Sequence, residues 1–129
     1  MKHLAIFKGD GAEKILKGEK SIESRFSKGK IAPFGVISSG DLVYIKVSGG
    51  DIIGQFKVQK VLTYDGLSDL DIKEIENKFG EQIAAEKNYW KDKRECKYAT
   101  LIFIGASQRF ITSPIKIPKK DLRGWVVLG

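Results

Sequence analysis

The sequence predicts an α+β fold that is mostly β, a small barrel of five or six mainly antiparallel strands with two or three short helices. Three observations favour this fold. Short apolar segments of strand length recur along the chain, two of them flank Gly49-Gly50 as in a hairpin, and the regular strand–helix alternation of a doubly wound sheet is absent. The 129 residues contain no repeat or linker, so residues 1–129 are expected to form a single domain.

The first third of the chain predicts strand, helix, strand and loop in that order. His3–Lys8 is a short apolar run typical of a buried strand. Asp10 is a suitable N-cap for a short helix, and Gly18 is suited to end that helix. Ser21–Phe26 then alternates as a strand does, whereas residues 28–39 are rich in glycine and proline and predict a loop.

The remaining strands are predicted by apolar and β-branched runs. Asp41–Ser48 and Ile52–Leu62 are expected to form the hairpin. Tyr98–Ile104 is the most apolar segment of the chain, and Arg109–Ile117 and Trp125–Leu128 are expected to close the chain as shorter strands. Short connections between these segments favour antiparallel pairing.

One helical region is expected between the hairpin and the last strands. Ser68 or Asp69 can cap it. Apolar residues then recur at helical spacing: Ile72, Ile75, Phe79 and Ile83. Gly80 is expected to interrupt this helix, and a second short helix is expected within Glu81–Lys91.

The net charge of +7 is concentrated near the C-terminal end. Residues 1–86 contain as many basic as acidic residues, whereas residues 87–123 contain ten Lys or Arg and three Asp or Glu. Such a concentration favours a polyanionic partner, because each phosphate contact releases counterions. The alternative is a solvated surface that keeps the protein soluble, and charge alone does not separate the two.

Several classes of site and location are disfavoured. Cys96 is the only cysteine and His3 the only histidine, so no internal disulfide, Cys/His metal site or Cys/His catalytic pair is expected. No apolar run reaches 18 residues, and the N-terminal apolar run is too short for a signal peptide. We therefore expect a cytoplasmic monomer with no membrane partner, no metal and no cofactor.

Residues 18–26, GEKSIESRF, combine charges with two apolar residues. Alternation along a strand places Ile22 and Phe26 on one face, where they can anchor the strand in the core. Glu23 and Arg25 then share the other face, about 7 Å apart along the strand. Lys20 lies at the preceding turn, where alternation does not fix its direction, and can reach Glu23.

This set of charges has two readings. As a ligand site, Glu23 accepts hydrogen bonds from a base or amide, Arg25 forks onto a phosphate or carboxylate, and Lys20 acts as a point charge or a base. As a surface ion-pair cluster, the same residues contribute little to stability.

The basic C-terminal region offers further candidate contacts to nucleic acid. Trp90 is the best candidate for stacking on a base, because charged residues follow it, while Trp125 is expected in the core. The other candidates are Lys91, Tyr98, Lys119, Lys120 and Arg123. Core packing explains Tyr98 equally well, and lysines at sheet edges also serve to block aggregation.

The pattern Gly18-x-Lys20-x-x-Glu23-x-Arg25, after a short helix ending in ILKG, resembles the signature of the ASCH domain family of the PUA-like superfamily. The context agrees, since Gly40-Asp41 precedes a strand and Trp125 follows Arg123-Gly124. The end of the chain, KYATLIFIG followed by PIKIPKKDLRGWVVLG, is also similar to members of this family.

The resemblance implies a PUA-like barrel with helices over its openings. It also implies that Lys20, Glu23 and Arg25 line a cleft that binds RNA, single-stranded nucleic acid or a nucleotide-like ligand. One branch of the family hydrolyses the amide of N4-acetylcytidine with a lysine, a threonine and a later glutamate. Lys20 matches the lysine, but Glu23 stands at the position of the threonine, so binding is favoured over catalysis. The later acid is left open among Glu74, Glu76, Glu81 and Glu86.

Overall fold

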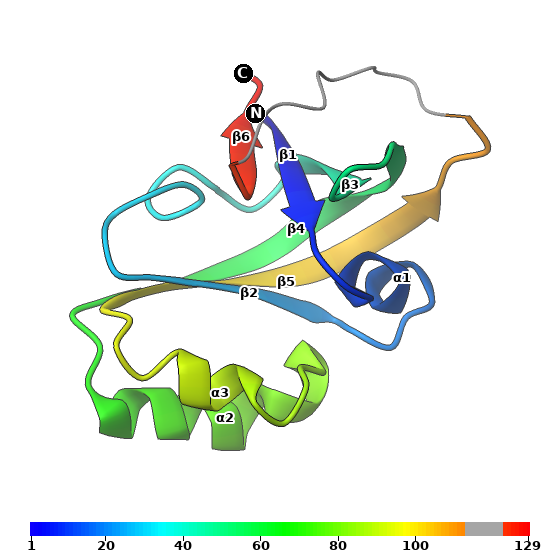
Figure 1. Cartoon of the computed structure of the whole chain (residues 1–129). Helices are drawn as coiled ribbons and strands as arrows, with labels where there is room; N and C mark the ends of the chain where they lie inside the picture. The colour runs from blue at the N-terminus through cyan, green and yellow to red at the C-terminus, as the bar shows by residue number, and fades with distance from the viewer. Residues whose placement is uncertain (113–122) are drawn as a thin grey trace.

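The computed structural model describes residues 1–112 and 123–129 (Figure 1). In chain order the elements are β1 (Lys2–Phe7), α1 (Gly11–Leu16), β2 (Ile22–Ser27), β3 (Leu42–Val47), β4 (Ile52–Asp65), α2 (Asp69–Ile83), α3 (Tyr89–Asp92), β5 (Tyr98–Arg109) and β6 (Trp125–Val127). No helix among these residues is long and apolar enough to cross a membrane.

The six strands form one mixed sheet in the order β2-β5-β4-β3-β1-β6. Its neighbours pair antiparallel, except that β1 and β3 are parallel. The sheet curls into a half-barrel, α2 and α3 lie together beside the β2–β5 part, and α1 follows the end of β1 (Figure 1). The predicted α+β fold, mostly β and with a β3–β4 hairpin, is therefore confirmed.

The curl of the sheet separates two apolar cores. The inner core lies inside the half-barrel and includes Phe7, Ile45, Phe56 and Trp125. The outer core lies between β2, β5 and the helices α2 and α3, and includes Ile22, Leu101 and Trp90. Ile22, Glu23 and Ser24 at the start of β2 are all buried, so both faces of this part of the strand are shielded from solvent.

Three boundaries differ from the sequence prediction. Gly80 does not interrupt α2, because the four buried residues Ile72, Ile75, Phe79 and Ile83 anchor the helix across it, and packing outweighs the roughly 1 kcal/mol cost of a glycine. The helix expected within Glu81–Lys91 is reduced to α3. β5 continues to Arg109 because it keeps pairing with the long β4. The prediction of a separate strand that begins at Arg109 is therefore wrong for residues 109–112. Residues 113–117 of that predicted strand lie outside the described residues.

α2 begins with the cap expected for it. The Ser68 hydroxyl accepts a hydrogen bond from the Asp71 backbone N–H, and the Asp71 carboxylate accepts one from the Ser68 backbone N–H. This reciprocal capping box satisfies two N–H groups that a helix leaves unpaired. Ser68 is therefore the N-cap.

A buried polar network ties β6 to β1 and β3. The Trp125 indole N–H donates to His3 Nδ1 at 3.1 Å, so His3 Nε2 carries the ring proton and donates to Asp41 Oδ2 at 2.8 Å. Burial alone would raise the pKa of Asp41, but hydrogen bonds from His3 and the Ser38 backbone N–H lower that pKa overall. His3 is thus a fully buried structural residue.

Replacing Asp41 by asparagine is predicted to destabilise the fold at pH 7 by about 1 to 3 kcal/mol, because a charged acceptor for His3 is lost. The folded-state pKa of Asp41 is lowered, so its contribution is complete above the unfolded value of about 4 and disappears as the pH falls through the folded value. In urea unfolding, the difference in the free energy of unfolding between wild type and Asp41→Asn should therefore become smaller below about pH 4. Asp51→Asn, at an exposed turn, is the matched control. If the difference between wild type and Asp41→Asn is the same at pH 7 and pH 3, the ionised Asp41 does not have this stabilising role.

Candidate functional site

A cleft of about 660 Å³ runs beside the free edge of β2. It is bounded by the end of β1 and the start of α1 on one side and by the connection from α2 to α3 on the other. The residues lining it with charged or polar side chains are Lys8, Asp10, Lys14, Lys20, Glu23, Ser24, Arg25, Glu86, Asn88, Tyr89, Asp92 and Lys93. The three residues of the sequence motif therefore face one hollow.

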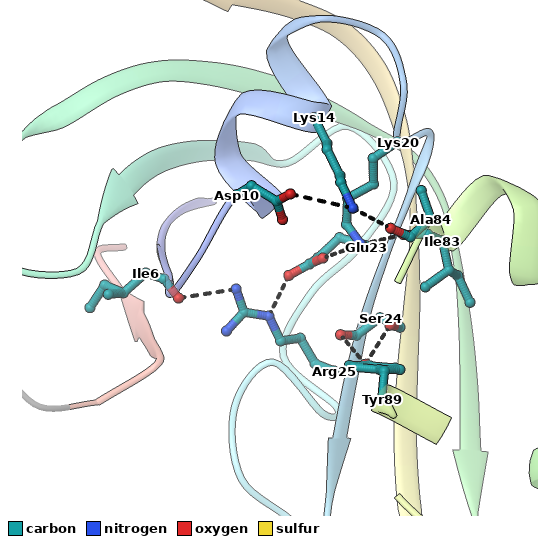
Figure 2. Close-up of polar contacts among 10 residues, drawn as sticks. All are labelled: Ile6, Asp10, Lys14, Lys20, Glu23, Ser24, Arg25, Ile83, Ala84 and Tyr89. Atoms are coloured by element: carbon teal, nitrogen blue, oxygen red, sulfur yellow. Dashed lines mark hydrogen bonds and ion pairs between the residues drawn. The ribbon is translucent and has the colours of Figure 1, made fainter. Parts of the chain in front are cut away.

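Lys20, Glu23 and Arg25 form a nearly buried ion-pair cluster in this cleft (Figure 2). Lys20 Nζ lies 3.2 Å from Glu23 Oε1, and Arg25 Nε donates to Glu23 Oε2 at 2.7 Å. The side chains of Lys20 and Glu23 are 8% and 7% exposed. Because a surface ion-pair cluster would be well solvated, the alternative raised by the sequence does not describe these residues.

The local sequence explains how the cluster forms. The N–H of Gly18 bonds to the Ile15 carbonyl, and that of Glu19 bonds to the Lys14 carbonyl, which is a Schellman motif with Gly18 in the left-handed region at φ +77°. This turn ends α1 and directs Lys20 back toward β2. Alternation on β2 then holds Glu23 and Arg25 on one face, while Ile22 packs in the outer core.

Two lysines also bind the carboxyl end of α2 (Figure 2). Lys20 Nζ donates to the Ile83 carbonyl at 2.6 Å, and Lys14 Nζ donates to the Ala84 carbonyl at 2.9 Å and lies 3.6 Å from Asp10 Oδ2. Cations are favoured at this end of a helix, because its last carbonyls lack intrahelical partners. The lysines thereby fix the α2–α3 connection as one wall of the cleft.

Arg25 joins the two edges of the curled sheet. Its Nη1 donates to the Gly124 carbonyl at 3.0 Å and its Nη2 to the Ile6 carbonyl at 3.3 Å, while the guanidinium lies over the rings of Phe7 and Trp125. The sequence suggested that this fork would meet a ligand phosphate or carboxylate. In the structure the fork meets backbone carbonyls, so its clearest role is to orient Glu23 and to close the half-barrel.

Tyr89 and Ser24 add a second polar pair to the wall of the cleft. Their hydroxyl oxygens are 2.6 Å apart, and the Tyr89 hydroxyl also donates to the Ser24 carbonyl at 3.2 Å. Burial, with a smaller contribution from the Glu23 charge, raises the pKa of Tyr89, so this hydroxyl stays protonated and able to donate. Sequence reasoning did not find Asp10, Lys14 or Ser24 as residues of the cleft. Asp10 and Lys14 come beside β2 only through the packing of α1, and Ser24 lies on β2 itself, where Tyr89 of α3 reaches it.

The other predicted contacts do not line the cleft. Trp90 is only 9% exposed and packs edge-on against Phe26, so its ring is not available to stack on a base. Tyr98 is partly buried and packs edge-on against Phe34, with centroids 5.1 Å apart. Lys91 and Arg123 are exposed outside the cleft, and Lys119 and Lys120 lie outside the described residues. Trp125 is buried, as expected for a core residue.

Among the acids left open by the sequence, Glu86 alone lines the cleft. Glu74, Glu76 and Glu81 are exposed on α2. In residues 1–112 and 123–129, no three His, Cys, Asp or Glu side chains gather as metal ligands would. The chemistry that the described cleft offers is therefore that of ammonium, guanidinium, carboxylate and hydroxyl groups.

Comparison with solved structures supports the fold. The crystal structure of ASCH from Zymomonas mobilis matches with a TM-score of 0.66 and 14% identity, over 84% of this chain and 69% of that one. A variant of that protein gives a TM-score of 0.67. A protein described as hypothetical matches with a TM-score of 0.53 and 20% identity, over 81% of this chain and 97% of that one. The sequence matches no family model, and no curated protein is similar to it. The resemblance to ASCH proteins is thus confirmed in the fold.

Replacing Glu23 by alanine is predicted to cost about 3 to 5 kcal/mol of stability, because Lys20 and Arg25 lose the carboxylate that neutralises them in a buried setting. Glu23→Gln keeps the shape and should cost less, about 1 to 3 kcal/mol. Denaturant unfolding measures both values. Glu95→Ala, which breaks the exposed pair with Lys28, is the control and should have little effect. A Glu23→Ala protein as stable as this control would contradict the structural role of the cluster.

Proposed function

We propose that this chain, which has the fold of an ASCH protein, binds RNA, single-stranded nucleic acid or a nucleotide-like ligand in the cleft beside β2. The observation that carries the proposal is the nearly buried Glu23 carboxylate, held by Lys20 and Arg25 at the side of a 660 Å³ hollow. A hollow of this volume accommodates a small ligand, and a few fixed polar groups within it can give specificity.

The charges around the cleft suit a ligand with a polar base and an anionic group. Glu23 accepts hydrogen bonds from ring or amino N–H groups. Lys8 and Lys93 line the same hollow and are more accessible than Lys20, so they can contact a phosphate. The concentration of basic residues from position 87 onward adds long-range attraction for a polyanion.

Binding of a short single-stranded RNA is predicted to weaken steeply with salt. The double change Lys8→Gln with Lys93→Gln should lower affinity several-fold and reduce the salt slope by roughly one for each lysine that contacts a phosphate. Fluorescence anisotropy at several salt concentrations measures both quantities. Lys73→Gln with Lys78→Gln, on the exposed face of α2, removes equal charge away from the cleft and is the matched control. If the two double variants behave alike, the cleft is not the binding site.

A second candidate function is hydrolysis of an amide on a modified nucleoside. One observation favours it: Lys20 Nζ and the Glu23 carboxylate are 3.2 Å apart and both face the cleft. Glu23 can take a proton from water as its oxygen bonds to the acyl carbon, and Lys20 can donate a proton to the departing amine as the C–N bond breaks. The products of N4-acetylcytidine would be acetate and cytidine.

If this candidate is correct, incubation with N4-acetylcytidine should release cytidine, and Lys20→Gln should lower the rate by at least about a hundredfold, the scale of lost acid–base assistance. Chromatography of the nucleosides measures the release. Melting curves of the variant, together with Lys73→Gln as a charge control, separate loss of chemistry from loss of fold. An unchanged rate in folded Lys20→Gln, or no cytidine from the wild type, removes the hydrolase candidate and leaves binding untouched.

A further inference from the structure

The two oxygens of the Glu23 carboxylate each contact one cation of the chain. Oε1 receives Lys20 and Oε2 receives Arg25, one partner on each oxygen. A carboxylate oxygen has two lone pairs, so each oxygen keeps one acceptor position beyond these described contacts. Figure 2 shows the carboxylate between Lys20 and Arg25, pointing toward the side of the cleft where Asp10 and Ile6 lie. The cleft therefore presents two adjacent acceptors in one plane.

Lys20 adds one hydrogen-bond donor beside the two acceptor positions of Glu23. Two of its three N–H groups are directed to the Ile83 carbonyl and to Glu23 Oε1, which leaves a third. Because Lys20 flanks Oε1, the order along the edge of the cluster is donor, acceptor, acceptor. A ligand that matches this edge presents an acceptor followed by two donors.

We infer, on the basis of the proposed function, that the cleft is selective for guanine. Its Watson–Crick edge carries O6, N1–H and N2–H in that order, so N1–H and N2–H meet the two Glu23 oxygens and O6 meets Lys20. Bases are commonly read through this edge when they are unpaired. Guanine is the base for which all three positions of the cluster are matched.

The other bases leave a mismatch against Glu23. Uracil has an acceptor on each side of its single N3–H, so one carbonyl oxygen faces a carboxylate oxygen. Adenine and cytosine each present one amino group next to a ring acceptor. An acceptor against a nearly buried carboxylate is costly, because both groups have lost water without gaining a hydrogen bond. The preference arises from these unpaired contacts as much as from the matched ones.

The test compares ribonucleoside 5′-monophosphates at low salt by calorimetry or ligand-observed NMR. GMP should bind most tightly, and IMP, which lacks only the N2 amino group, should bind about tenfold or more weakly, as expected for one lost charge-assisted hydrogen bond. UMP, AMP and CMP should each bind more weakly than GMP, because each places an acceptor against Glu23. Equal affinity for GMP and IMP would overturn the inference.

Variants separate this inference from the proposed function. Glu23→Gln, confirmed as folded by its melting curve, should lower GMP affinity about tenfold or more and remove the difference between GMP and UMP. Lys93→Gln should weaken all nucleotides similarly and keep their order, and Lys73→Gln should change nothing. If every nucleotide binds with equal affinity, the guanine inference fails and the proposed binding function stands. If none binds, the guanine inference fails and the RNA-binding measurement with the Lys8 and Lys93 variants decides the proposed function. If Glu23→Gln does not fold, the comparison of GMP with IMP on the wild type decides the guanine inference.

Discussion

The neutralisation of Glu23 is the constraint on which the rest of this structure depends. A carboxylate this buried is tolerated only with well-placed partners, since the loss of its water is costly. Lys20 and Arg25 supply them, and each of these two cations also reaches the backbone of another element. Through Lys20 the pair is tied to the end of α2, and through Arg25 to the ends of β1 and β6. One neutralised charge therefore connects four segments that are distant in the sequence.

Much of the fold follows from local sequence. Alternation on β2 correctly places Ile22 and Phe26 on the strand face that packs in a core, and the spacing of apolar residues in α2 gives its buried face. The reach of Lys20 toward Glu23 was also predicted from the turn before β2. Element boundaries were less predictable where packing outweighs propensity, as at Gly80, which stays helical because buried residues lie on both sides of it.

The resemblance implied a cleft at Lys20, Glu23 and Arg25, but the other walls of this cleft could not be predicted from the sequence. Its walls come from α1, β2 and the α2–α3 connection, and the approach of Lys14 to Ala84 spans 70 positions of the chain. No local pattern reports such a contact. The same limit explains Trp90: its charged neighbours suggest an exposed ring, but the packing of α3 against Phe26 buries it. Charged residues next to an aromatic residue in the sequence therefore do not show that its ring is exposed.

The way the cluster is built bears on how a ligand would bind. Lys20, Glu23 and Arg25 are held by contacts that exist without a ligand, so little conformational entropy remains to be lost on binding. A ligand that meets the remaining acceptor positions of Glu23 adds hydrogen bonds without displacing Arg25 from the carbonyls that close the half-barrel. The hydrogen bonds that stabilise the fold and the acceptor positions open to a ligand then belong to different lone pairs of the same carboxylate. This separation lets a residue that the fold requires also serve recognition, because occupying the cleft leaves its structural partners in place.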